Sequence, residues 1–313
     1  MENAPVIELR GVSATRSGYE VLKDISFSLA DGETSVFMGG AGSGKSSLLK
    51  TAAGVTIPDG GQVLFRGRDL AAMSRAEELE FHRLSGFVFQ DAALWANQSL
   101  FDNLALPCRF HDPRLSKAEV ERAVRRAAEI VGYRDELSSR PAELSSGERR
   151  LIGLARALVL DPELLFMDEP ASYLDEESAD RVYDIIAQLR ARRRTIAVVS
   201  GSSDIAYRFA DALGVLKEGR LLAFGPYAEA VAWSDPSLRS ATGRLRARKK
   251  AAEGDAALIE AWAEALASAP DPEPRGSPPG PEPGGGAAGR AGDGSPGGGA
   301  GGRDGEAKDE EDA

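Results

Sequence analysis

Short, almost fully apolar runs alternate with amphipathic segments along most of the chain. The apolar runs lie at Glu33–Gly40, Glu163–Pro170 and Arg194–Ser200, while Ser116–Gly132 has apolar residues spaced three and four apart after a capping serine. Fully apolar short strands that alternate with helices are typical of a parallel sheet covered on both faces. The pattern therefore predicts an α/β fold.

Other segments predict the elements around that core. Val6–Leu9 and Ile25–Leu29 have the apolar patterns of strands in a small antiparallel sheet. A Pro-Asp-Gly-Gly turn precedes Gly61–Leu70, which we expect to form one strand, and Leu84–Gln90 predicts another. Residues 95–158 are expected to be mostly helical.

The pattern changes after Trp233, and we expect three parts: a domain over 1–233, a helical extension over 234–270 and a tail over 271–313. In the tail, 21 of 43 residues are Gly or Pro and the net charge is −6, so disorder is expected. The basic cluster Arg244–Lys250 fits either a solvated helix face or a contact with anionic lipid heads.

Charge and composition exclude several classes of protein. The chain carries −11 in all, so the part before the tail carries −11 − (−6) = −5, which gives no nucleic-acid footprint. Cys108 is the only cysteine, which excludes an intramolecular disulfide and fits a reducing compartment. The N-terminal residues lack the basic and apolar regions of a signal peptide, so none is expected, and no apolar run approaches the ~18 residues of a spanning helix. We expect a cytosolic protein that only a partner holds at a membrane.

The first candidate site is a glycine-rich loop between an apolar strand and an amphipathic helix. It matches the phosphate-loop pattern G-x-x-x-x-G-K-[ST] and comprises Gly39, Gly40, Ala41, Gly42, Ser43, Gly44, Lys45, Ser46 and Ser47. Its backbone N–H groups and the helix N-terminus would hold the phosphates of ATP. Lys45 would reach the β- and γ-phosphates, and the Ser46 hydroxyl would bind Mg²⁺.

Two carboxylates and a serine-glycine turn could complete this site. Asp168 ends an apolar strand and could hold Mg²⁺, and Glu169 could orient or deprotonate the attacking water; an ordinary solvated turn is the alternative. The stretch Leu144–Glu148, with Ser145 and Gly147, should cap a helix and could bind a phosphate there.

In this order and spacing, residues 5–232 resemble the ATP-binding cassette (ABC) family. The resemblance implies a P-loop NTPase fold with a mixed parallel core sheet, an N-terminal antiparallel subdomain and a helical subdomain at about 95–158 that docks on a membrane permease. It implies head-to-tail dimers, with ATP between the phosphate loop of one cassette and Ser145 and Gly147 of the other. Gln90 would sense the γ-phosphate and Mg²⁺, and a D-loop would end at Asp175.

Residues 73–109, "MSRAEELEFHRLSGFVFQDAALWANQSLFDNLALPCR", are similar to the ATPases of Mla-type, MCE-associated lipid-transport systems. This resemblance implies a peripheral protein on the inner face of the cell membrane. The implied partners are a phospholipid permease, a second cassette in a homo- or heterodimer, and an MCE-domain lipid-binding protein.

Two departures from the family concern the nucleotide. Ser146 and Glu148 replace Gly and Gln of the usual LSGGQ, and Glu148 would bring negative charge near the γ-phosphate held by the partner cassette. Arg16 stands where most of the family stacks an aromatic on adenine. Arg16 or nearby Tyr19 could stack there, or both could be exposed hairpin residues.

The third departure is Gly201, which stands where the family has a histidine that contacts the γ-phosphate. The two histidines of the chain, His82 and His111, lie in the helical region and cannot replace it. Loss of one such donor lowers a rate by roughly 10²–10³. The leading hypothesis is a transport ATPase; the alternative is a degenerate cassette that binds ATP and dimerises but hydrolyses slowly. A soluble ABC protein of translation or DNA repair is disfavoured, because the chain has one cassette and no heptads between Gln90 and Ser145.

Overall fold

The computed structural model describes residues 5–238, 242–243 and 245–247, which contain two sheets. A four-stranded antiparallel sheet has the order β2-β1-β4-β5, and a six-stranded mixed sheet has the order β10-β9-β3-β8-β7-β6. The strands are β1 (Pro5–Arg16), β2 (Tyr19–Ala30), β3 (Thr34–Gly39), β4 (Gly60–Phe65), β5 (Arg68–Asp69), β6 (Ser85–Val88), β7 (Leu164–Asp168), β8 (Thr195–Ser200), β9 (Ala212–Lys217) and β10 (Arg220–Pro226). The predicted fold class is confirmed.

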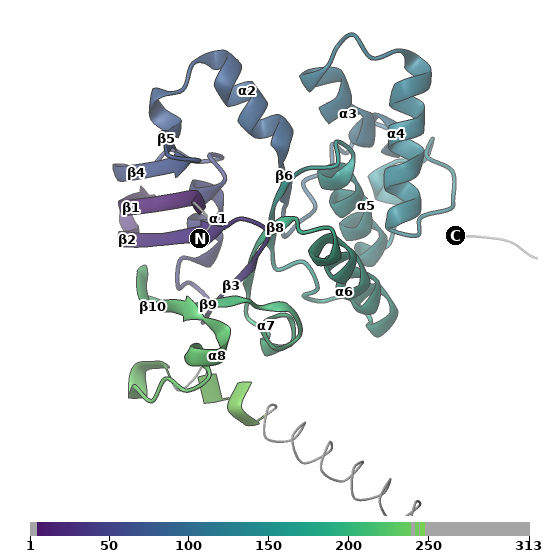
Figure 1. Ribbon diagram of the computed structural model, residues 1–313. Helices are drawn as coiled ribbons and strands as arrows, with labels where there is room; N and C mark the ends of the chain where they lie inside the picture. Colours follow the sequence, from purple (N-terminus) through teal and green to yellow (C-terminus); the bar gives the residue numbers. More distant parts are fainter. Residues whose placement is uncertain (1–4, 239–241, 244, 248–313) are drawn as a thin grey trace, which may run out of the picture. The chain divides into compact units, whose positions relative to one another are not determined.

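The helices lie mainly on one side of the six-stranded sheet. Figure 1 shows α3 to α6 gathered there, with the antiparallel sheet on the other side. The helices are α1 (Lys45–Ala52), α2 (Arg75–Leu84), α3 (Leu100–His111), α4 (Lys117–Ile130), α5 (Ser146–Leu158), α6 (Glu176–Ala191), α7 (Ser203–Phe209) and α8 (Tyr227–Ala230). Ser116 caps α4 as predicted, because Ser116 and Glu119 form a capping box.

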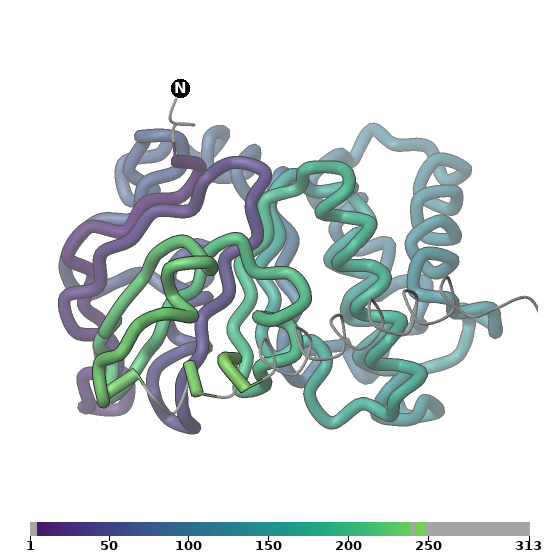
Figure 2. The backbone as a smooth tube through the Cα atoms, turned by 60° about the horizontal axis from the view of Figure 1, so that its bottom comes forward, coloured from purple at the N-terminus to yellow at the C-terminus, as the bar shows by residue number. Residues whose placement is uncertain are grey.

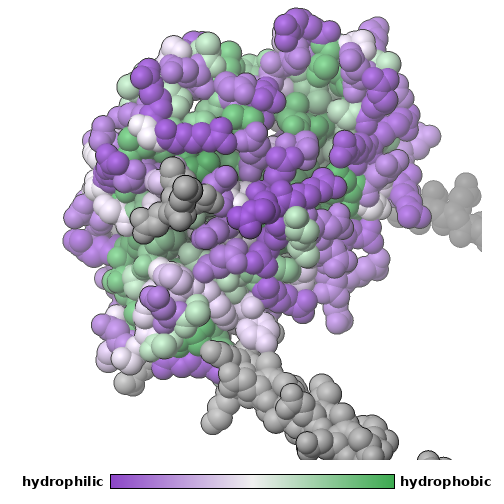
Figure 3. Space-filling model, viewed as in Figure 1, coloured by the Kyte–Doolittle hydropathy of each residue, from purple (hydrophilic) through white to green (hydrophobic). Residues whose placement is uncertain are grey.

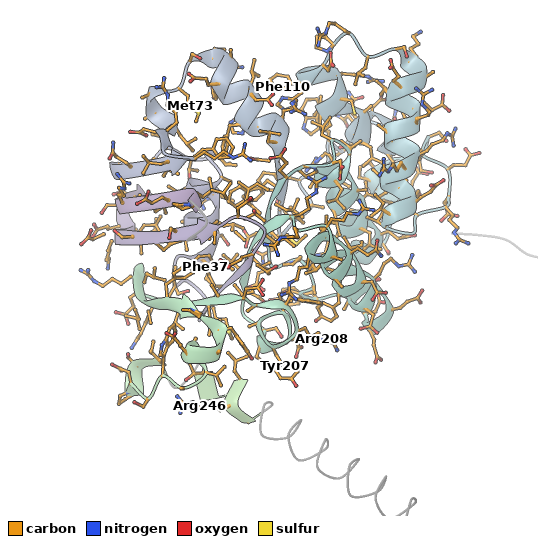
Figure 4. All side chains as sticks on the ribbon, in the orientation of Figure 1. Phe37, Met73, Phe110, Tyr207, Arg208 and Arg246 are labelled. Carbon is orange, nitrogen blue, oxygen red and sulfur yellow. The ribbon has the colours of Figure 1, made fainter. Side chains whose placement is uncertain are left out.

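Successive residues of the central strands face two different cores. Val36 and Met38 of β3 join the core under the helices, while Phe37 joins the core that α1 shares with the antiparallel sheet. Phe37 stacks on Phe224 of β10 with ring centroids 5.5 Å apart, and Figure 4 shows Phe37 between the two sheets. Burial on both faces explains why these strands read as continuous apolar runs.

Segments far apart in the chain meet beside the phosphate loop. The N–H of Lys23 in β2 donates to the carbonyl of Gly219, 2.8 Å away, in the turn between β9 and β10. Figure 2 shows the N-terminal strands beside these late strands. The antiparallel sheet is thereby fixed next to the end of β3.

One strand that the sequence predicts is two strands in the structure. Gly61–Leu70 was predicted as a single strand, but β4 ends at Phe65 and β5 begins at Arg68. Arg66 and Gly67 both have positive φ, 48° and 79°, and so make a tight hairpin turn. The prediction was wrong because Arg66 and Gly67 form a turn that interrupts the run.

Among the last described residues, Arg246 bonds to the segment that follows α8. The guanidinium of Arg246 donates to the carbonyls of Val231 and Trp233, and Figure 4 shows Arg246 beside α8. The predicted tail 271–313 and most of the predicted extension and basic cluster lie outside the described residues. Within the described part, no helix is long and apolar enough to cross a bilayer, and the face in Figure 3 is largely hydrophilic.

Candidate functional site

The phosphate loop joins the end of β3 to the start of α1. Glycine is required at its first position, because a Cβ on Gly39 would lie 2.4 Å from the carbonyl oxygen of Leu216 in β9. Gly44 has φ of 100° and caps α1 in the left-handed region. A Cβ on Gly40 would meet nothing within 4 Å, so one side of the loop is open.

Lys45 and Ser46 connect this loop to the end of β7. The Lys45 ammonium donates to the carbonyls of Gly39 and Gly40, at 3.0 and 3.1 Å, and lies 3.8 Å from Glu169 Oε1. The Ser46 hydroxyl donates to Asp168 Oδ1 at 2.9 Å. The loop and the two carboxylates, far apart in sequence, thus meet at one edge of the sheet.

Asp168 is almost completely buried, with 2% of its surface exposed. Burial raises the pKa of its carboxyl above the ordinary range, and the hydrogen bond from Ser46 and the nearby Lys50 oppose that shift. A divalent cation at this place would favour the ionised carboxylate. The Ser46–Asp168 pair and the open backbone of the loop therefore fit Mg²⁺ and the phosphates of a nucleotide.

Glu169 follows β7 in a left-handed conformation with φ of 49°. Its backbone N–H donates to the carbonyl of Val199, 3.0 Å away. Three groups donate to its carboxylate: Gly201 N–H to Oε1 at 2.8 Å, Ser172 Oγ to Oε2 at 2.6 Å, and Ser200 Oγ to Oε2 at 3.4 Å. The carboxylate is therefore held in place by the chain itself.

Position 201 contacts Glu169 although it lacks the histidine of the family. A Cβ on Gly201 would meet Glu169 Oε1 at 3.5 Å, an ordinary contact distance, so a side chain has room there. The backbone N–H alone contacts the carboxylate. Sequence reasoning missed Ser172, which stands three residues after Glu169, as in a short side-chain turn.

The signature segment Leu144–Glu148 forms the N-terminus of α5. Ser145 caps the helix, since its Oγ accepts from Glu148 N–H at 3.2 Å and Glu148 Oε2 accepts from Ser145 N–H at 2.8 Å. These hydrogen bonds lower the pKa of Glu148. The negative charge of Glu148 is therefore kept at its own helix terminus, which the pattern Ser-x-x-Glu could have predicted.

Gln90 and the hairpin residues lie on the surface. Gln90 is exposed in the turn after β6. Arg16 pairs with Tyr19 across the turn between β1 and β2, and both side chains are exposed. This arrangement fits the hairpin alternative, and adenine stacking by Arg16 or Tyr19 stays a prediction.

Several known proteins are similar in sequence to this chain. A family model described as "ABC transporter" matches residues 22–172. A protein of Mycobacterium leprae named probable ribonucleotide transport ATP-binding protein is 35% identical over 237 residues, covering 74% of this chain and 67% of its own length. A molybdate/tungstate import ATP-binding protein of Thermococcus kodakarensis is 33% identical, covering 72% of this chain and 66% of its own length.

A solved structure has the same fold. The dimeric bacterial ABC transporter cassette MJ0796 aligns with a TM-score of 0.66 at 24% identity, over 71% of this chain and 98% of its own. The matched part of this chain spans only about two thirds of the length of these relatives in sequence.

Proposed function

Since the chain belongs to the ABC transporter family, whose cassettes are ATPases, we propose that it binds Mg·ATP and hydrolyses it to drive a permease. The observation that carries the proposal is the meeting of the phosphate loop with Asp168 and Glu169 at one edge of the sheet. The permease would hold the chain on the inner face of the cell membrane.

Each residue of this edge has a role in the proposal. Gly39–Ser47 would bind the phosphates through backbone N–H groups and Lys45, while Ser46, Asp168 and Gln90 would hold Mg²⁺. Bound Mg²⁺ would neutralise charge on the phosphates. Glu169 would take a proton from the attacking water, and its place beside Lys45 puts it near the γ-phosphate that Lys45 would bind.

A second cassette would supply Ser145 and Gly147 to this nucleotide. Support comes from Gly147, where an added Cβ would meet Ser178 Oγ at 3.4 Å and Asp175 Oδ2 at 3.5 Å, both ordinary contacts. The chain's own packing therefore does not demand glycine there. A small residue at this point suits the close approach of another molecule's phosphate.

Lipid is the proposed cargo, on the resemblance of residues 73–109 to Mla-type ATPases. An MCE-domain protein would then be a further partner. Because the Mycobacterium leprae relative is named for ribonucleotide transport, cargo should be tested directly. In vesicles reconstituted with the permease, phospholipid should stimulate ATP turnover and ribonucleotides should not; the reverse result would contradict the lipid proposal.

Glu169→Gln tests hydrolysis in the full chain. We expect Mg-dependent phosphate release to fall by roughly 10²–10⁴, the usual contribution of a positioned base, while ATP binding persists. Glu163→Gln is the matched control, since Glu163 pairs with Arg66 on the surface at the other end of β7. Turnover that survives Glu169→Gln would remove Glu169 as the base. The comparisons give no support to a degenerate cassette.

A further inference from the structure

The hydrogen bonds that hold the Glu169 carboxylate are connected to α5, the helix that follows the signature segment. We propose that Ser172 is the positioning residue of the Glu169 carboxylate and that Arg150 of α5 fixes Ser172 in turn. This inference rests on the ATPase activity proposed above. It assigns to two residues outside the phosphate loop the task of orienting the group that takes the proton from water.

The first step is the turn from Glu169 to Ser172. The backbone N–H of Ser172 donates to the carbonyl of Glu169 at 3.2 Å, and its hydroxyl donates to Oε2 at 2.6 Å. Hydrogen bonds of this length from a hydroxyl to a carboxylate are among the strong ones in proteins. The turn and the side chain together fix one oxygen of the carboxylate.

The second step is the weakness of the other hydrogen bond to that oxygen. Ser200 Oγ lies 3.4 Å from Oε2, near the limit for a hydrogen bond, whereas Gly201 N–H donates to the other oxygen, Oε1. Among the described residues, Ser172 is therefore the only side chain with a short hydrogen bond to the carboxylate. Without it, Oε2 would keep only the long contact with Ser200, and the carboxylate could turn about the Oε1 contact.

The third step is the anchor of Ser172 itself. The guanidinium of Arg150 donates to the Ser172 carbonyl and lies 5.6 Å from the ring centre of Tyr173, over its face. Tyr173 has φ of 60°, and 86% of its surface is exposed, so packing within the chain does little to fix it. Arg150 thus sets the position of this turn from α5, whose N-terminus is Ser145.

A signature segment that engages a partner's nucleotide is therefore linked mechanically to the chain's own Glu169. The link runs from α5 through Arg150 to the Ser172 carbonyl, and from the Ser172 hydroxyl to the carboxylate. A small displacement of a positioned group lowers turnover strongly, because the reacting atoms need close alignment. Loss of either contact should act on kcat rather than on ATP binding.

The test measures kcat and KM for Mg·ATP with the full chain carrying Ser172→Ala. We expect kcat to fall roughly 10- to 100-fold, the usual effect of losing a hydrogen bond to a charged group, with KM unchanged. Ser172→Thr keeps the hydroxyl and should restore kcat to within a few-fold of wild type. Arg150→Met keeps the stem without the donors and should lower kcat roughly 2- to 10-fold.

Controls separate positioning from a general loss of structure. Ser138→Ala removes another serine-to-glutamate hydrogen bond, from Ser138 Oγ to Glu136 Oε2 at 2.8 Å, and should leave kcat unchanged. In a Glu169→Gln background, Ser172→Ala should have no further effect on the residual rate. A large additional fall in that background would contradict positioning of Glu169.

The outcomes distinguish this inference from the proposed function. Wild type without Mg-dependent turnover would refute the ATPase and the inference together. Wild type with turnover that is lost in Glu169→Gln but kept in Ser172→Ala would refute the inference alone. Ser172→Thr as slow as Ser172→Ala would also refute it, since the hydroxyl would then not be the active group.

Discussion

The phosphate loop Gly39–Ser47 and the signature segment Leu144–Glu148 both lead into a helix N-terminus, but their surroundings differ. A Cβ on Gly39 would collide with the backbone of β9 at 2.4 Å, whereas a Cβ on Gly147 would make only ordinary contacts at 3.4 Å and beyond. The loop is shaped by the chain's own packing. The signature keeps a small residue that its own chain does not require.

This difference separates two reasons for a glycine. At Gly39 the packing of β9 excludes a side chain, whether or not a nucleotide is bound. Gly147 is also buried, but an added Cβ would make only ordinary contacts there, so the packing of the chain does not require glycine. Replacement by alanine should therefore reduce stability at Gly39, whereas at Gly147 it should spare stability and reduce turnover.

Gly39→Ala should have the largest effect on the fold. The new methyl group must displace the backbone of β9, which should lower the free energy of unfolding by about 1–3 kcal/mol, with ATP binding reduced as well. Thermal unfolding and ATP titration of the full chain would measure both. Unchanged stability would show that the loop is more adaptable than its packing suggests.

Gly147→Ala should spare the fold and reduce activity. Its free energy of unfolding should stay within about 1 kcal/mol of wild type, because alanine favours a helix. Turnover of the paired cassettes should fall roughly 10- to 100-fold through misplacement at the second nucleotide contact. Full turnover in this variant would refute the idea that the signature serves a partner's nucleotide.

The contact between α2 and α3 should depend on pH. Burial is the main cause that lowers the pKa of His82 and of His111. For His82, Glu78 opposes this shift and Arg75 adds to it. For His111, His82 and Arg83 add to the shift, while a hydrogen bond with the backbone of Leu79 and the charge of Glu80 oppose it. Their ordinary value is 6.5, so below that pH the unfolded chain binds more protons than the folded one. Stability should therefore fall as the pH drops below this value.

A double variant isolates this effect from the many carboxylates. Replacing both residues, as in His82→Gln with His111→Gln, should reduce the loss of Tm between neutral pH and pH 5.5 by on the order of 2 °C. Circular dichroism melting at the two pH values would measure it. Identical pH dependence in wild type and variant would exclude the histidines as its source.

Gly201→His should have the smallest effect. The backbone N–H that bonds Glu169 is kept, and the new side chain has room beside Oε1. Because the proposed cassette hydrolyses ATP without a donor from this position, turnover should change less than about threefold. A rise of an order of magnitude would instead favour the slow, degenerate cassette.

Sequence reasoning could predict the parts of the site that follow local rules. The phosphate loop follows an apolar strand and precedes a helix, and Asp168 ends a buried strand, as expected. The hold on Glu169 could not be predicted, because it depends on the positive φ of Glu169 and on Ser200 and Gly201 arriving from β8. Such contacts arise from strand order, which no single segment encodes.

Strand order also determines when this site can first exist. β3 lies between β8 and β9, which begin at Thr195 and Ala212. At a synthesis rate of about 5–20 residues per second, β8 leaves the ribosome roughly 8 to 30 s after β3. During that interval the apolar strand that carries the phosphate loop has neither of its neighbours. A chain that stalls before Thr195 therefore presents an unpaired strand to other nascent chains and to chaperones.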